Sequence, residues 1–151
     1  MQISTIPMES LAEILSLQME SGGTARLVVT GGSMYPTLRH RKDVVHLTPV
    51  VKPLKRGDLV LYKRKNGQFV LHRIVSKPKN GEFICCGDNQ WKKEPVAEEQ
   101  VIAIVDGFVR KEKNFKETSP SYRLWVGVWT ALFPVRRPLL AIRRRLGRLR
   151  R

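Results

Sequence analysis

The chain has few cysteines, few acidic residues and no apolar run of membrane-spanning length. Its two cysteines, Cys85 and Cys86, are neighbours, and neighbouring cysteines form a disulfide only with strain. A disulfide framework is therefore excluded, which fits a reducing compartment. The apolar segment 124–135 has twelve residues, whereas a membrane span needs about 20. Because the N-terminus carries acids and no basic region, we expect no signal peptide either.

The charge is strongly positive and unevenly placed. The 151 residues hold 28 Lys and Arg against 13 Asp and Glu, a net charge of +15. Residues 136–151 contribute eight arginines and no acid. The length suits one domain and excludes a second full one. The positive charge favours partners with phosphate or anionic lipid, but its concentration at the C-terminus argues against a nucleic-acid binder as a whole.

Apolar periodicity predicts a helix followed by a mostly β region. Apolar residues recur at helical spacing from Met8 to Met19, and Gly22 and Gly23 end the pattern, so residues 1–23 are expected to form an N-terminal amphipathic helix. Turn residues at 55–58, 65–67 and 79–81 include two Asn-Gly pairs, which are typical of tight hairpins. The expected strands are RLVVT, DVVHL, DLVLYK, FVLHRIV, EFICC and QVIAIVDGFV, in a β domain at residues 24–113.

The last segment, residues 114–151, is expected to be a hinge and a helical tail. Polar residues 111–121 form the hinge, and Leu139, Ile142, Leu146 and Leu149 then repeat at helical spacing among arginines. One interpretation places residues 124–151 on an anionic membrane surface, where tryptophans and a cationic amphipathic helix are typical. A second, held equally open, packs this helix on the β domain with a solvated basic face. Contact with nucleic acid is a weaker third, because no aromatic-interleaved motif supports it.

Ser33 has the surroundings of a nucleophile. It follows Gly31 and Gly32, which let a ligand approach the backbone closely, and Pro36 stiffens the turn after it. A serine hydroxyl is weakly nucleophilic at neutral pH. It therefore needs a base within hydrogen-bond reach and a carboxylate that orients this base.

His72 is the best candidate for that base. Strand alternation places it on one face with Val70 and Ile74, while Arg73 lies on the other. Partial burial keeps an imidazole neutral near pH 7, the form that accepts a proton. Spacing alone nevertheless favours a core histidine with a satisfied hydrogen bond.

Asp88 is a candidate carboxylate. Gly87 permits a sharp exit from the preceding strand, so Asp88 can orient His72, although Gly-Asp-Asn is also an ordinary turn. His40 and His46 lack metal-ligand spacing with another His or Cys, so we expect no zinc site and no cofactor.

In order along the chain stand GGSMYPTL, KDVV, RGDLVLYK, VLHRIV, CCGDN, EPV and VIAIVDGFV. This set resembles the catalytic domain of type I signal peptidases, in the branch of the endoplasmic reticulum, archaea and some sporulating bacteria. That branch uses histidine where the main bacterial branch uses lysine. The resemblance covers residues 26–110; each piece is weak, but the ordered combination is specific. It implies a coiled β-sheet or barrel for this region, so the expected fold is mostly β, with the short N-terminal helix and the basic amphipathic C-terminal helix that the periodicity predicts.

The resemblance implies Ser33 as nucleophile and His72 as general base. For His72 this favours the general base over the core histidine that spacing alone favours. Asp88 matches the family's Gly-Asp, and Glu94 stands where the branch usually has the aspartate that partners the histidine. Glutamate has a longer and more flexible arm. Either Asp88 or Glu94 is expected to orient His72, with a slight preference for Asp88.

The chain departs from the family pattern at the oxyanion site. Many members have Ser or Thr where this chain has Gly31, so the resemblance implies an oxyanion hole of backbone N–H groups. Thr30 is a possible substitute donor, and the oxyanion and substrate-binding set is Thr30, Gly31, Gly32 and Met34. Since loss of one donor costs about 100- to 1000-fold in rate, we expect weak activity.

The expected substrate is a peptide or protein that adds as a strand to a sheet edge, with small side chains at the first and third positions before the cut. The family carries a membrane anchor before the serine, and this chain has 32 polar-to-amphipathic residues there. The resemblance therefore suggests a cytoplasmic member of the wider superfamily, with peripheral contact to the inner face of the membrane.

Three functions are compared. The first is an endopeptidase that uses Ser33 and His72. The second is a non-catalytic peptide-binding or membrane-adaptor module on the same fold, suggested by Gly31 and Glu94. The third, ranked last, is a self-cleaving repressor related to the SOS autopeptidases; no Ala-Gly or Cys-Gly pair precedes Ser33, and no room remains for a DNA-binding domain. Oligomeric state is left open.

Overall fold

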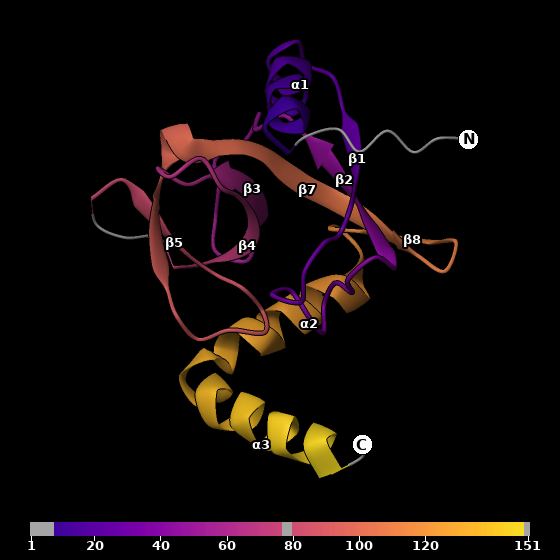
Figure 1. Cartoon of the computed structure of the whole chain (residues 1–151), viewed down its shortest axis with the longest axis vertical. Helices are drawn as coiled ribbons and strands as arrows, with labels where there is room; N and C mark the ends of the chain where they lie inside the picture. The colour runs from indigo at the N-terminus through magenta and orange to yellow at the C-terminus, as the bar shows by residue number, and fades with distance from the viewer. Residues whose placement is uncertain (1–7, 77–79, 150–151) are drawn as a thin grey trace.

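The short β-branched runs form strands, and helices precede and follow them (Figure 1). The computed structural model describes residues 8–76 and 80–149. Residues 1–7 of the expected N-terminal segment, Lys79 of the expected turn, and Arg150 and Arg151 lie outside the described residues. The strands are β1 (Ala25–Val28), β2 (Asp43–Thr48), β3 (Leu59–Lys63), β4 (Phe69–Ser76), β5 (Glu82–Cys86), β6 (Glu94–Ala97), β7 (Val101–Arg110) and β8 (Lys113–Lys116). The helices are α1 (Met8–Glu20), α2 (Pro120–Ala131) and α3 (Arg136–Leu149), with single 3-10 turns η1 (Glu98–Gln100) and η2 (Phe133–Val135).

The predicted mostly β chain with a short helix before it and a basic helix after it is confirmed. The described strands form one antiparallel sheet in the order β1-β2-β7-β3-β4-β5-β6, with β8 beside β7. The end strands β1 and β6 have four residues each and do not pair with one another. Of the two forms expected, the structure therefore has the open sheet and not the closed barrel.

Strand β4 exposes an unpaired edge to the space beside β1. Residues 69–73 of β4 pair with β3. On its other side it pairs with β5 only from Arg73 onward. Because β1 is also an end strand, β1 and the first half of β4 each have one backbone edge that pairs with no other described strand.

Two apolar clusters lie on the two faces of the sheet. Both faces of β3 are buried because each one contacts a different cluster. Leu15 and Met19 of α1 join the first cluster, so this helix covers one face. The first cluster includes Val29, Met34, Leu38, Val45, Leu47, Leu59, Leu61 and Phe108, and the second includes Val60, Tyr62, Val70, Ile74, Phe83, Cys85 and Val96.

The structure differs from expectation in residues 111–121. This segment was expected to be a hinge, but β8 lies in it and pairs with β7, and Phe115 stacks on Phe108 with ring centres 5.0 Å apart. The burial of that aromatic pair favours a strand in a polar sequence. The expected helical tail is divided by η2 into α2 and α3. Within residues 8–76 and 80–149, no helix combines the length and apolar character that crossing a bilayer requires.

The backbone of β8 occupies the place that a side chain at Gly107 would need. A Cβ at Gly107 would lie 2.6 Å from the backbone oxygen of Phe115, whereas nothing lies within 4 Å of a Cβ at Gly127 in α2. We therefore expect Gly107→Ala to lower the free energy of unfolding by about 1–3 kcal/mol. Gly127→Ala is the matched control, and it should raise this free energy by about 0.5–1 kcal/mol because alanine favours the helix. Urea denaturation measures both; equal effects would contradict the β7–β8 contact.

Candidate active site

The segment that carries Ser33 is a loop between β1 and β2 that is held at several points. Gly31 has φ +81°, a left-handed conformation that favours glycine. Further along the loop, Arg110 of β7 donates to the carbonyl of Thr37 (2.7 Å) and pairs with buried Asp43. The loop that positions Ser33 is thus fixed to the sheet on the side of β7.

His72 lies in β4, on the face of the second apolar cluster, and only 4% of it is exposed. Its Nδ1 lies 3.2 Å from the Tyr62 hydroxyl and 3.3 Å from Oε1 of Glu94. Tyr62 donates its own hydrogen to Glu94 Oε1, and a carboxylate only accepts. Nδ1 must therefore carry the proton, which leaves the lone pair of neutral His72 on Nε2.

Glu94, the first residue of β6, is fixed in place by two neighbours. Arg64 binds it with two hydrogen bonds, Nε to Oε2 at 2.9 Å and Nη2 to Oε1 at 2.7 Å, and Tyr62 donates the third. Burial raises the pKa of Glu94, but these hydrogen bonds outweigh burial and hold it below its usual range. The flexible glutamate arm is therefore an ionised and well-anchored partner for His72.

The electrostatics keep His72 neutral. Burial, the largest effect, lowers the pKa of His72 below 6.5, and Glu94 opposes this only in part. Burial and the bond to Glu94 raise the pKa of Tyr62, so it stays a donor. Between the lowered pKa and 6.5 the unfolded chain binds more protons at His72 than the folded chain, so in this window stability falls as pH falls.

The backbone carbonyl of Ser33 and Nε2 of His72 both lie close to Gly87. A Cβ at Gly87 would lie 2.6 Å from the carbonyl oxygen of Ser33 and 3.1 Å from Nε2 of His72. Asn89 binds the Ser33 segment from the same turn, because its N–H donates to the Ser33 carbonyl (2.8 Å) and its Nδ2 to the Gly32 carbonyl (3.0 Å). The absence of a side chain at Gly87 therefore permits the approach of these two groups.

Both residues line one cleft of about 780 Å³. Among the described residues no hydrogen bond joins the Ser33 hydroxyl to His72; such bonds are often long in a free enzyme and shorten when substrate binds. The cleft is bordered by the two free edges, residues 27–30 from β1 onward and residues 69–72 of β4. Its other lining residues include Leu15, Gly31, Met34, Leu61, Arg64 and Gln90.

Asp88 has a different place from the one preferred on sequence grounds. It is fully buried and forms a two-point ion pair with Arg73, Nε to Oδ1 at 2.9 Å and Nη2 to Oδ2 at 2.7 Å. Thr37, four residues after Ser33, donates to the same carboxylate. The contacts with His72 Nδ1 come instead from Glu94 and Tyr62, so this geometry favours Glu94 over Asp88 as the orienting carboxylate.

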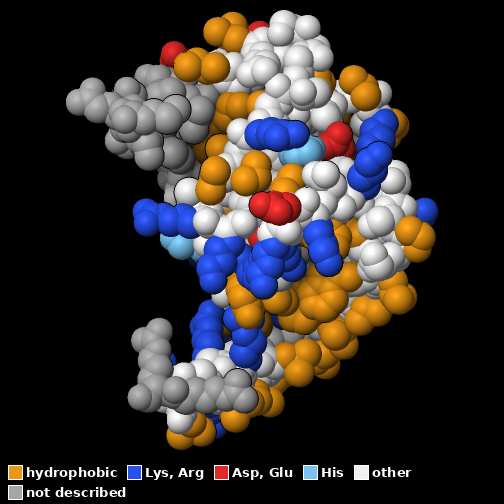
Figure 2. Space-filling model, turned by 90° about the vertical axis from the view of Figure 1, so that its right-hand side faces the viewer, with side chains coloured by type: hydrophobic (Ala, Val, Ile, Leu, Met, Phe, Trp, Pro, Cys, Tyr) orange, Lys and Arg blue, Asp and Glu red, His pale blue; other side chains and the backbone are white. Residues whose placement is uncertain are grey.

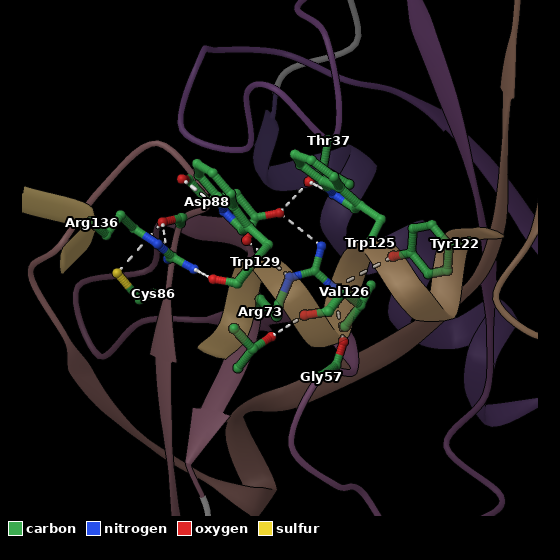
Figure 3. A network of polar contacts seen from close by, with 12 residues as sticks. Thr37, Gly57, Arg73, Cys86, Asp88, Tyr122, Trp125, Val126, Trp129 and Arg136 are labelled. Carbon is green, nitrogen blue, oxygen red and sulfur yellow. Dashed lines mark hydrogen bonds and ion pairs between the residues drawn. The ribbon is translucent and has the colours of Figure 1, made fainter. Parts of the chain in front are cut away.

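Helix α2 closes the Asp88 network from outside (Figure 3). Trp125 Nε1 donates to Thr37 Oγ1 (2.9 Å), and Trp129 Nε1 donates to the Asp88 carbonyl (3.2 Å). Buried Arg136 lies over the Trp129 ring and donates to the Trp129 carbonyl. The two tryptophans, which on sequence grounds suggested membrane contact, therefore serve the packing of α2 on the β domain.

The residues expected to form the oxyanion site differ in whether they have a free hydrogen-bond donor. The N–H of Gly31 donates to Nδ1 of His40 (2.7 Å), so it is already used. Thr30 is exposed and lines the cleft, while Met34 is buried in the first cluster and also reaches the cleft wall. Within the described residues the N–H groups of Gly32 and Ser33 have no acceptor, so both remain available as hydrogen-bond donors.

The two cysteines are poor candidates for a nucleophile. Burial raises the pKa of Cys85 to about 12 and that of Cys86 to about 11, which keeps both as thiols. Within the described ranges, no three His, Cys, Asp or Glu side chains are grouped to hold a metal ion.

Sequence reasoning missed Tyr62, Arg64, Thr37 and Asn89. Tyr62 and Arg64 reach Glu94 only because β3 pairs with β4 and β6 with β5 in one particular register. No motif marks that register. Asn89 was visible as part of Gly-Asp-Asn, but its bonds to the serine segment come from tertiary contact.

A scan against protein-family models finds no match to this chain, and a search of curated protein sequences finds none either.

Substitutions of Asp88 and Glu94 should differ in their effect on the free energy of unfolding. Removing the charge of Asp88 leaves Arg73 buried and unpaired, so Asp88→Asn should lower the free energy of unfolding by about 3–5 kcal/mol. Glu94→Gln breaks partly exposed contacts and should change it by only about 1 kcal/mol or less. Urea denaturation at neutral pH measures both variants. A larger loss for Glu94→Gln than for Asp88→Asn would contradict these assignments.

Proposed function

We propose that this protein is a serine endopeptidase that uses Ser33 as nucleophile and His72 as general base, in a manner similar to the Ser/His branch of type I signal peptidases. The observation that carries the proposal is the neutral His72, whose Nδ1 is bound by Glu94 and Tyr62 and whose Nε2 faces Gly87 beside Ser33. A core histidine needs no such carboxylate, nor an opening onto a cleft that also contains a serine.

The chemistry follows from this geometry. The Ser33 Oγ attacks the peptide carbonyl carbon while His72 Nε2 takes the hydroxyl proton. Glu94 stabilises the imidazolium that forms, and the N–H groups of Gly32 and Ser33 bind the oxyanion. His72 then gives the proton to the leaving amine, the C–N bond breaks, and an acyl-enzyme remains. Water, deprotonated by His72, hydrolyses the ester and restores Ser33.

The substrate is an extended peptide in the cleft. The free edges at residues 27–30 and 69–72 both border it, so a strand lying between them can bond to either edge. The walls are mainly apolar, with Leu27, Val29 and Leu71 among them. These walls favour apolar side chains, and the resemblance to type I signal peptidases suggests small ones, so we propose cleavage after small, apolar side chains.

A non-catalytic peptide-binding module on the same fold is the second candidate. The observation that favours it is the bond from Gly31 N–H to His40, which removes one donor from the oxyanion site. Such a module would bind the same extended peptides and leave them uncut.

A fluorophosphonate probe distinguishes these candidates. If Ser33 is activated, mass spectrometry should show the probe on Ser33, and Ser33→Ala should abolish both labelling and cleavage of an Ala-x-Ala peptide. Glu94→Gln should slow labelling by roughly 10²–10⁴-fold, because the ring loses its orientation and the imidazolium its counter-charge. Thr48→Ala, which is outside the cleft, is the control and should label as the wild type does. Equal labelling of wild type and Ser33→Ala would contradict the proposal that the protein is a serine peptidase.

The rate of labelling should depend on pH through His72. The pKa of His72 lies below 6.5. The labelling rate should therefore stay level from neutral pH to below 6.5, and it should fall once the pH drops through the pKa of His72. Glu94 raises the pKa of His72, so Glu94→Gln should move the fall to still lower pH. The pH profile of the labelling rate measures both. A profile that is flat through the acid range would mean that a group other than His72 is the base.

A further inference from the structure

An apolar stripe runs along the outer side of α2, η2 and α3. Its members in α2 are four residues apart and those in α3 three or four, which keeps them on one side of each helix, and one further member lies in η2 between the helices. All are between 41% and 82% exposed, although each is a large hydrophobic side chain. The stripe consists of Leu124, Val128, Val135, Leu139, Ile142, Leu146 and Leu149.

Side chains of α3 outside the stripe contact the protein. Leu140 and Arg136 are its buried side chains. Arg143 lies over the Tyr35 ring at 4.0 Å and approaches Asn89 Oδ1 at 3.4 Å, and Arg144 lies over Trp91 at 5.2 Å. The contacts of α3 with the protein are thus made largely by arginines, and its apolar side is left to solvent. Monomeric proteins rarely leave so long an apolar surface uncovered.

Positive charge surrounds the stripe. With 3.6 residues per turn, Arg143 and Arg145 fall on its two flanks, and Arg148 lies further round the helix. Residues 120–149 contain no acidic side chain. Figure 2 shows hydrophobic side chains along the lower edge of the molecule, with Lys and Arg side chains gathered above them.

We propose that this stripe docks on the surface of an anionic lipid bilayer. Apolar side chains that enter the headgroup region, with arginines beside them on lipid phosphates, are what such a helix requires. A second copy of the chain is disfavoured, because its identical cationic helix would repel this one. A nucleic acid would bind the arginines but leaves the apolar stripe without a partner. The cytoplasmic leaflet supplies the anionic lipid.

Docking also sets the position of the cleft. Tyr35 and Asn89, which contact Arg143, are near neighbours of Ser33 in the loop and through hydrogen bonds. The docked helix therefore holds the Ser33 loop near the headgroups, where membrane-bound peptides are presented. The docking does not require the Ser33 hydroxyl, so it stands or falls separately from the peptidase.

Vesicle flotation of the full chain tests the proposal. The wild type should float with phosphatidylcholine vesicles that contain phosphatidylglycerol, and much less with pure phosphatidylcholine. Ile142→Glu with Leu146→Glu should abolish flotation, whereas Val51→Glu, which adds an acid at an exposed apolar residue on another loop, should reduce it far less. Arg145→Gln with Arg148→Gln should weaken binding about 30-fold. Lys42→Gln with Lys113→Gln is the control of equal charge.

Ser33→Ala should float as the wild type does, and the Glu variants should keep the circular dichroism spectrum and the urea midpoint of the wild type, which shows that they fold. Three results would overturn the proposal. One is equal flotation of the wild type and the Ile142/Leu146 variant. Another is a dimer in light scattering that this variant dissociates, in the absence of vesicle binding. The third is binding to DNA or RNA but not to vesicles, lost with the arginines and kept with the Glu substitutions.

Discussion

The buried ion pair between Arg73 and Asp88 is the interaction on which the arrangement of this protein depends. Both side chains are fully buried, so each charge is tolerated only because the other is present. Arg73 comes from β4 and Asp88 from the turn after β5. Thr37 adds the serine loop to the pair, and α2 reaches it through Trp125 and Tyr122. One pair therefore joins four segments that are distant in sequence.

The placement of the chemical groups follows from this junction. Arg73 and His72 are neighbours in β4 and point to opposite faces, so fixing one fixes the other. Gly87 and Asn89, on either side of Asp88, contact the Ser33 backbone. The motifs around Ser33, His72 and Asp88 are thus parts of one structural unit. Asp88 positions this unit, and Glu94 is the carboxylate in contact with the imidazole.

Sequence predicts the local structure well where the pattern is strong. The alternation around His72 gives both the strand and the opposite directions of His72 and Arg73. Sequence could not predict whether Asp88 or Glu94 contacts His72. That contact depends on how β6 pairs with β5 and on the position of Arg64 across the sheet. The short β8 was also missed, because its polar residues form a strand only through the stacking of Phe115 on Phe108. The inward direction of Trp125 likewise comes from tertiary hydrogen bonding.

The central claim is that Glu94 and Tyr62 hold the proton of neutral His72 on Nδ1 and leave Nε2 free toward Ser33. Nitrogen NMR of the imidazole, above its pKa, reads this tautomer directly. The account predicts a protonated Nδ1 and an unprotonated Nε2 in the wild type. A ring that carries its proton on Nε2 would contradict it, because that nitrogen would then be unable to accept the hydrogen of the serine hydroxyl.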